Sequence, residues 1–147
     1  MLEQLTQFFQ RKHAPEAPLP KPDAKLALGT LLVRVAMADK AYLFEEIEQI
    51  DRILAKAYDL NPIEAAKMRA TCEKLAFSVE NDEDMAALIR DSVDYDHRRE
   101  KVEALWQVVL ADGITDEREA ALVDLIEKVL GVDADHSEAA RLAASIP

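Results

Sequence analysis

Apolar residues recur at helical spacing along almost the whole of this 147-residue chain. Around Trp106, for example, apolar side chains stand at intervals of three and four residues, which places them on one face of an α-helix. No segment alternates between apolar and polar residues for long enough to predict a β-strand. The chain also has only 3 glycines and 5% aromatic residues, a composition that disfavours a β-sandwich or barrel. The sequence therefore predicts an all-α protein, a helical bundle of about seven or eight helices.

Prolines separate the N-terminal segment from the rest of the chain. Residues 1–12 carry apolar side chains at helical spacing and are predicted to form a short amphipathic helix. Four of the six prolines lie between Pro15 and Pro22, and they predict an extended linker over residues 13–22 because proline and its predecessor disfavour helix. We expect one compact all-helical domain over residues 23–147. The N-terminal helix is expected to pack on that domain, since a free helix so short is marginal in water.

A shift of 73 residues superimposes two parts of the sequence and pairs residues 29–54 with residues 102–127. The unit is longer than that of a solenoid protein, which is about 20–50 residues. We therefore expect two helical halves, related by a pseudo-two-fold axis and packed face to face around one core. The residues that match under this shift are Leu32 and Leu105, Val35 and Val108, Ala38 and Ala111, Asp39 and Asp112, Glu46 and Glu119, Asp51 and Asp124, and Ile53 and Ile126.

The repeated element is a turn between two helices. In each copy an apolar helix runs into Ala-Asp, a turn of five or six residues follows, and a glutamate stands early in the next helix. The first copy runs from Asp39 to Glu46, and the second from Asp112 to Glu119.

The two copies of this turn differ in the residue after the aspartate. Gly113 in the second copy suits a left-handed conformation that ends the preceding helix. Lys40 occupies the same position in the first copy, where it would bear a steric cost of about 1 kcal/mol or adopt another turn. Thr115 is expected to cap the helix that follows the second turn.

This Ala-Asp-Gly…Glu pattern, duplicated in a small acidic all-helical sequence, resembles the TerB-like family of tellurite-resistance proteins. The stretch Glu103-Ala-Leu-Trp-Gln-Val-Val-Leu-Ala-Asp-Gly113 is most similar to the stand-alone, uncharacterised bacterial branch of that family. The resemblance covers about residues 23–145, and Lys40 departs from it where glycine is usual. It implies a helical bundle associated with resistance to tellurite and other stresses, which acts as an adaptor or sensing module rather than as an enzyme.

Asp39, Glu46, Asp112 and Glu119 are the candidate site residues. One interpretation is a divalent-metal site, because hard cations take carboxylate oxygens and a turn can bring several of them together. The spacing is not that of an EF-hand loop. The simpler interpretation is structural: aspartate in a turn accepts hydrogen bonds from nearby backbone N–H groups, and glutamate early in a helix favours the positive end of its dipole. We expect Asp112 and Glu119 to act mainly as such acceptors.

Charge and cysteine usage exclude several classes of function. With 18 Lys and Arg against 29 Asp and Glu, the net charge of −11 argues against binding nucleic acid or anionic lipid. The single cysteine, Cys72, excludes an internal disulfide and a thiolate zinc site. No apolar stretch is long enough to insert into a membrane. With no activated nucleophile or phosphate-binding glycine loop, we expect no enzyme and no cofactor other than a divalent metal. The expected protein is cytoplasmic and binds a protein partner, with a homodimer left open.

Overall fold

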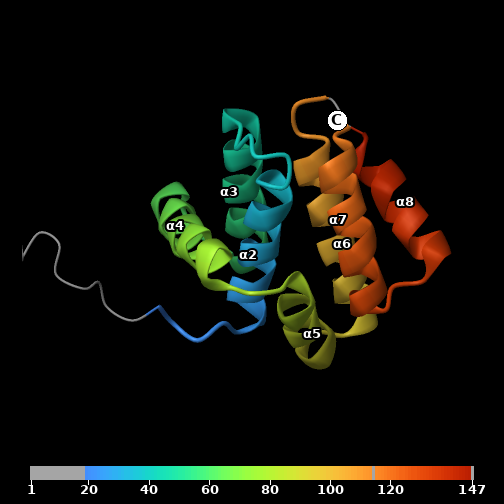
Figure 1. Cartoon of the computed structure of the whole chain (residues 1–147), viewed down its shortest axis with the longest axis horizontal. Helices are drawn as coiled ribbons and strands as arrows, with labels where there is room; N and C mark the ends of the chain where they lie inside the picture. Colours follow the sequence, from blue (N-terminus) through green and yellow to red (C-terminus); the bar gives the residue numbers. More distant parts are fainter. Residues whose placement is uncertain (1–18, 114, 147) are drawn as a thin grey trace, which may run out of the picture.

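The computed structural model describes residues 19–113 and 115–146, and within these residues the chain forms seven helices and no strand (Figure 1). The predicted all-α helical bundle is confirmed. The helix predicted over residues 1–12 lies outside the described residues. The seven helices are α2 (Ala24–Ala36), α3 (Phe44–Tyr58), α4 (Pro62–Ser78), α5 (Asp82–Ser92), α6 (Tyr95–Val109), α7 (Glu117–Leu130) and α8 (Ala134–Ala144).

Local sequence determines where several helices begin. At the start of α4, the Asn61 side chain accepts from the Glu64 N–H at 2.8 Å, and the Glu64 side chain accepts from the Asn61 N–H at 3.1 Å. Each group thereby satisfies a backbone donor that the helix itself leaves without a partner. Asp94 caps α6 in a similar way, by accepting from the His97 N–H at 3.0 Å.

Helix α2 forms the centre of the bundle. Nine of its 13 residues are buried, because α3, α4, α5, α6 and α7 all pack against it. Helices α2, α3 and α4 form one group in Figure 1, helices α6, α7 and α8 form the other, and α5 lies between them. Helix α4 packs against both α2 and α3, whereas α8 packs against α6. A helix that is apolar on nearly every side, as α2 is, must be covered in this way to be stable in water.

Helices α2 and α4 approach each other closely at Gly29. A Cβ atom at this position would fall well inside van der Waals distance of the Cys72 sulfur. Cys72 is fully buried at this crossing, and burial raises the pKa of its thiol to about 11. The expectation that this cysteine is a buried, inert thiol is therefore confirmed.

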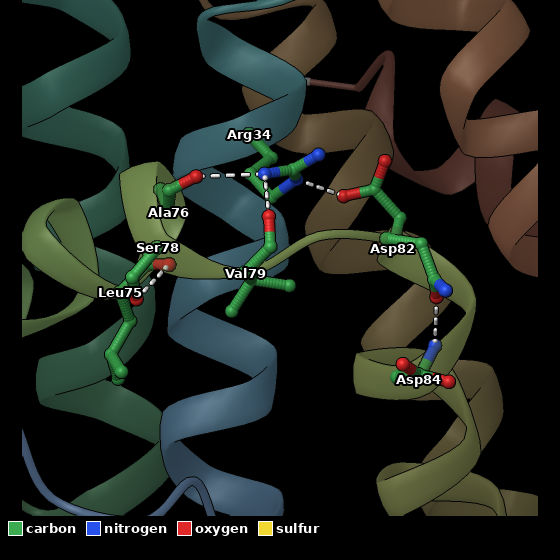
Figure 2. Close-up of polar contacts among 8 residues, drawn as sticks. Arg34, Leu75, Ala76, Ser78, Val79, Asp82 and Asp84 are labelled. Carbon is green, nitrogen blue, oxygen red and sulfur yellow. Dashed lines mark hydrogen bonds and ion pairs between the residues drawn. The ribbon is translucent and has the colours of Figure 1, made fainter.

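Arg34 joins the end of α4 to the start of α5 (Figure 2). One terminal nitrogen of its guanidinium donates to the Ala76 carbonyl at 2.7 Å and to the Val79 carbonyl at 3.1 Å. Its Nε forms an ion pair with Asp82 in the first turn of α5. The last carbonyls of a helix have no partner inside the helix, so this single side chain both caps α4 and fixes the position of α5.

Candidate functional site

The two repeated turns have matching backbone hydrogen bonds. The Ala38 N–H donates to the Val35 carbonyl and the Ala111 N–H to the Val108 carbonyl, each at 3.2 Å. One residue past the aspartates, the Lys40 N–H donates to Met37 at 2.9 Å and the Gly113 N–H donates to Leu110 at 3.0 Å. This agreement is local, and the superposition of the two whole halves stays a prediction.

Lys40 adopts the same left-handed conformation as Gly113. The φ angle is 65° at Lys40 and 79° at Gly113, so the first copy accepts the steric cost rather than forming another turn. Helix α6 ends earlier than predicted, at Val109, and Gly113 lies in the turn beyond it. The physical reason is that the chain leaves the helix through the bonds of the turn, which place the left-handed residue after the aspartate.

Glu46 and Glu119 stand in the first turns of α3 and α7, and both are buried, with exposed fractions of 2% and 4%. The Oε1 atom of Glu46 accepts a hydrogen bond from the Leu43 N–H at 3.0 Å. This contact is the backbone acceptor role that the structural interpretation describes. The other oxygen, Oε2 of Glu46, is buried and has no protein N–H or O–H donor.

Glu119 is placed differently, because Asp116 caps α7. The Asp116 Oδ1 accepts from the Arg118 N–H at 2.8 Å and from the Glu119 N–H at 3.1 Å. The prediction that Thr115 caps this helix was wrong, since the Asp116 carboxylate satisfies these two donors. The Oε1 atom of Glu119 is buried without a donor of its own.

The two buried glutamates share a proton. Burial raises the pKa of Glu119 to about 9, helped by its hydrogen bond to Glu46 and by the negative charges of Glu46, Asp39 and Asp116. Burial also raises the pKa of Glu46, and the charges of Asp39 and Asp112 add to the increase. The hydrogen bonds that Glu46 accepts from Glu119 and Leu43 act in the opposite direction. The proton therefore resides on Glu119, which donates to the Glu46 carboxylate.

We call Asp39, Glu46, Asp112, Asp116 and Glu119 the acidic centre. One carboxylate oxygen from each of Asp39, Asp116 and Glu119 lies within 4.8 Å of the other two. Asp39 also accepts from the Ala41 N–H at 2.9 Å, as expected for an aspartate in a turn. Asp112 is exposed, and its charge acts on Glu46.

The structure thus brings the four predicted residues into one region and adds a fifth. Sequence reasoning missed Asp116. The available signal was its position three residues before Glu119, which is the spacing of an N-cap to the third helical residue.

Within the described residues, this is the one group of three or more histidine, cysteine or acidic side chains close enough to hold a metal ion. His97 and His136 take part in other contacts. His97 is bonded to Asp94 at 2.7 Å, and His136 is bonded to the Tyr95 hydroxyl at 2.6 Å. None of the described helices combines the length and the apolar character needed to cross a membrane.

Comparison with known proteins identifies the family. No curated protein sequence matches the chain significantly. A crystal structure of a protein of unknown function from Porphyromonas gingivalis W83 is similar, with a TM-score of 0.60 and 19% identity over 88% of this chain and 96% of that chain. At that identity the likeness shows the fold alone. The family model described as tellurite resistance protein TerB matches residues 25–142, which is most of the chain, and the chain therefore belongs to the TerB family.

Proposed function

We propose that this TerB-family chain is a non-enzymatic helical domain that binds one divalent cation at the acidic centre. The observation that supports the proposal is the pair of buried carboxyl oxygens, Oε2 of Glu46 and Oε1 of Glu119, for which the described chain supplies no N–H or O–H donor. Capping accounts for Oε1 of Glu46 and for the Asp116 and Asp39 contacts, but it leaves these two oxygens unexplained. A buried carboxylate without a partner is strongly destabilising, and a cation relieves that penalty.

The chemistry of the group favours a hard cation. All the ligand atoms on offer are carboxylate oxygens, which suit Ca²⁺, Mg²⁺ and Mn²⁺ rather than thiophilic metals. Oxygens on opposite sides of Ca²⁺ are about 4.6–5.2 Å apart, since each lies about 2.3–2.6 Å from the ion. The spacing within 4.8 Å among Asp39, Asp116 and Glu119 is compatible with that span. On binding, the cation takes the place of the proton held between Glu46 and Glu119.

Titration calorimetry and thermal melting with Ca²⁺, Mg²⁺, Mn²⁺ and Zn²⁺ test this function. We expect a hard cation to raise the melting temperature of the native chain relative to EDTA, with a stabilisation of about 2.7 kcal/mol at one hundred times Kd. Glu46→Gln and Glu119→Gln should abolish the increase. Glu45→Gln and Glu117→Gln are matched controls, because both residues are exposed in the same helical turns, and they should retain it. An unchanged melting temperature in the native chain, or an increase that survives in both buried variants, argues against the site.

A second candidate function is protein interaction, which the exposed aromatic side chain next to the acidic centre favours. Phe44 is the first residue of α3, two residues from Glu46, and 72% of it is exposed. A large apolar side chain held open to water in the same turn as the acidic centre suits a partner that senses the state of that turn. The identity of the protein partner, and the alternative of a homodimer, stay predictions.

The comparison of two exposed phenylalanines tests this second function. Phe77 on α4 is 77% exposed and provides a matched control. A partner that copurifies with the native chain should be lost with Phe44→Ser and kept with Phe77→Ser. Equal retention by both variants argues against a role for Phe44.

The family description supports a role in tellurite or general stress response for such a domain. Tellurite tolerance of a strain that lacks the gene, complemented with native, Glu119→Gln or Glu117→Gln protein, connects that role to the acidic centre. We expect native and Glu117→Gln protein to restore tolerance and Glu119→Gln to fail. Equal complementation by all three proteins would separate the stress response from the site.

A further inference from the structure

A groove of about 680 Å³ runs between α3 and α6. Its floor is apolar and includes Leu28, Ile53 and Ala104, and its rim carries Lys56 and Lys101. Ala57, which is exposed, also lines it. Along α6 the lining residues extend from His97 to Gln107, which corresponds to about 15 Å of helix, or three turns.

The neighbouring groove between α2 and α7 shows what covers such a surface in this fold. Helix α5 packs against both α2 and α7, and its buried face there consists of Met85, Ala86 and Ile89. The predicted repeat pairs α2 with α6 and α3 with α7, so the α3–α6 groove is the counterpart of the groove that α5 fills. The chain has no second α5, because it ends soon after α8. No helix of residues 19–113 and 115–146 covers the α3–α6 groove.

The described chain begins close to this groove. Residue 19 is five residues before the start of α2. Lys25, in the first turn of α2, lies over the Tyr58 ring with its ammonium 5.4 Å from the ring centre, and Lys101 of the groove lies 5.7 Å from the same centre. Leu28, one turn further along α2, is part of the groove floor. The N-terminal segment is therefore tethered at the edge of the groove.

We propose that residues 1–12 form a helix that occupies the α3–α6 groove of their own chain. A helix of twelve residues is about 18 Å long and therefore matches the length of the groove. Leu2, Leu5 and Phe8 provide an apolar face for its floor. The proline-rich linker, residues 13–22, reaches about 31 Å when extended, so it spans the distance from α2 to any point of the groove. Tethering raises the effective concentration of the segment to the millimolar range, which makes a weak contact sufficient.

The charges of the segment are few and fit the mixed rim of the groove. Glu3 is the only acidic residue of the segment and can pair with Lys56 or Lys101, while Arg11 and Lys12 follow at its end. Glu100 and Glu103 on the α6 side of the groove offer partners for those two cations. A nearly neutral amphipathic helix is thus a better occupant than a strongly charged peptide.

Amide hydrogen exchange of the full chain, read residue by residue by NMR, tests the proposal. We expect the amides of residues 2–10 to exchange at least about tenfold more slowly than in an unstructured peptide. Ala57→Arg places a long charged side chain in the groove and should remove that protection. Ala139→Arg, at an exposed alanine of α8, is the matched control and should leave it intact. Protection that is absent in the native chain, or that persists with Ala57→Arg, overturns the proposal.

Two further measurements keep the test decisive if Ala57→Arg perturbs the fold. Leu5→Asp with Phe8→Asp changes only the segment, and it should shift the Ala57 and Ala104 methyl resonances while the Ala139 methyl stays in place. Unmoved Ala57 and Ala104 methyls overturn the proposal. Protection that disappears on tenfold dilution also overturns it, because the segment would then occupy the groove of a second copy.

Discussion

Glu46 and Glu119 form a hydrogen-bonded pair of buried carboxyl groups that joins the first turn of α3 to the first turn of α7. They occupy equivalent positions in the two copies of the repeated turn, yet their environments differ. The Leu43 N–H donates to Glu46, whereas in the second copy the cap is Asp116, an acid that adds negative charge beside Glu119. The proton therefore stays on Glu119, and one pair of repeated residues divides into an acid and its acceptor.

Stability should fall as pH rises in metal-free buffer. The folded chain keeps a proton on Glu119 up to a pKa of about 9, whereas the unfolded chain releases it near the model value of 4.5. Folding therefore takes up a proton between these values, and the stabilisation present below about pH 4.5 is lost as pH rises through about 9, with a slope of up to about 1.4 kcal/mol per pH unit. Glu119→Gln keeps a donor for Glu46 and removes this slope.

Urea unfolding with EDTA from pH 5 to pH 9 measures the effect. The difference in unfolding free energy between native protein and Glu119→Gln should shift in favour of the variant as pH rises, while Glu117→Gln follows the native protein. Parallel curves for the native protein and Glu119→Gln would show that Glu119 is ionised in the folded chain at neutral pH.

The left-handed turn residues should respond in opposite directions to exchange. Gly113→Ala introduces a Cβ that meets no other atom within 4 Å, so only backbone strain acts, and we expect a loss of about 1 kcal/mol of unfolding free energy. Lys40→Gly relieves the same strain at φ 65°, and the gain is smaller because glycine adds entropy to the unfolded chain. Equilibrium denaturation of both variants checks the pair. A stabilising Gly113→Ala would contradict the turn geometry.

Gly29→Ala should destabilise the protein although alanine is the better helix former. The gain in helix propensity is about 1 kcal/mol, and the clash of the new Cβ with the Cys72 sulfur outweighs it, for a net loss of about 1–3 kcal/mol. Removing the sulfur with Cys72→Ala should rescue part of that loss, so the double variant is more stable than the two single losses predict. Strict additivity in denaturant melts would mean that α2 and α4 separate freely at this crossing.

Arg34→Met should be among the most damaging surface-reaching substitutions. It leaves the Ala76 and Val79 carbonyls and the Asp82 carboxylate without their donor, and we expect a loss of about 2–4 kcal/mol. Arg34→Lys keeps the charge but not the forked geometry, so it should fall in between. Arg52→Met removes an ion pair with Glu48 that is 68% and 46% exposed, and it should cost less than about 1 kcal/mol. Equal effects of Arg34→Met and Arg52→Met in denaturant melts would reduce Arg34 to an ordinary surface cation.

The sequence predicted those parts of the fold that depend on neighbours along the chain. The Asn61 and Asp94 caps, the all-helical class and the positions of the two turns follow from residues three or four apart, which interact whatever the rest of the chain does. Thr115 was chosen over Asp116 because both residue types cap helices, and only the backbone geometry of the turn shows which one the two N–H groups reach.

The acidic centre depended on packing instead. The sequence by itself placed Glu46 and Glu119 early in two helices, and that location suits an exposed cap as well as a buried site. Only the tertiary structure buries them against each other and adds the charges of Asp39 and Asp116. The physical reason is that burial and charge interaction across 73 residues of chain require α2, α3, α6 and α7 to be packed together. The local sequence determined the helices, and the packing of those helices decided that two capping glutamates share one proton.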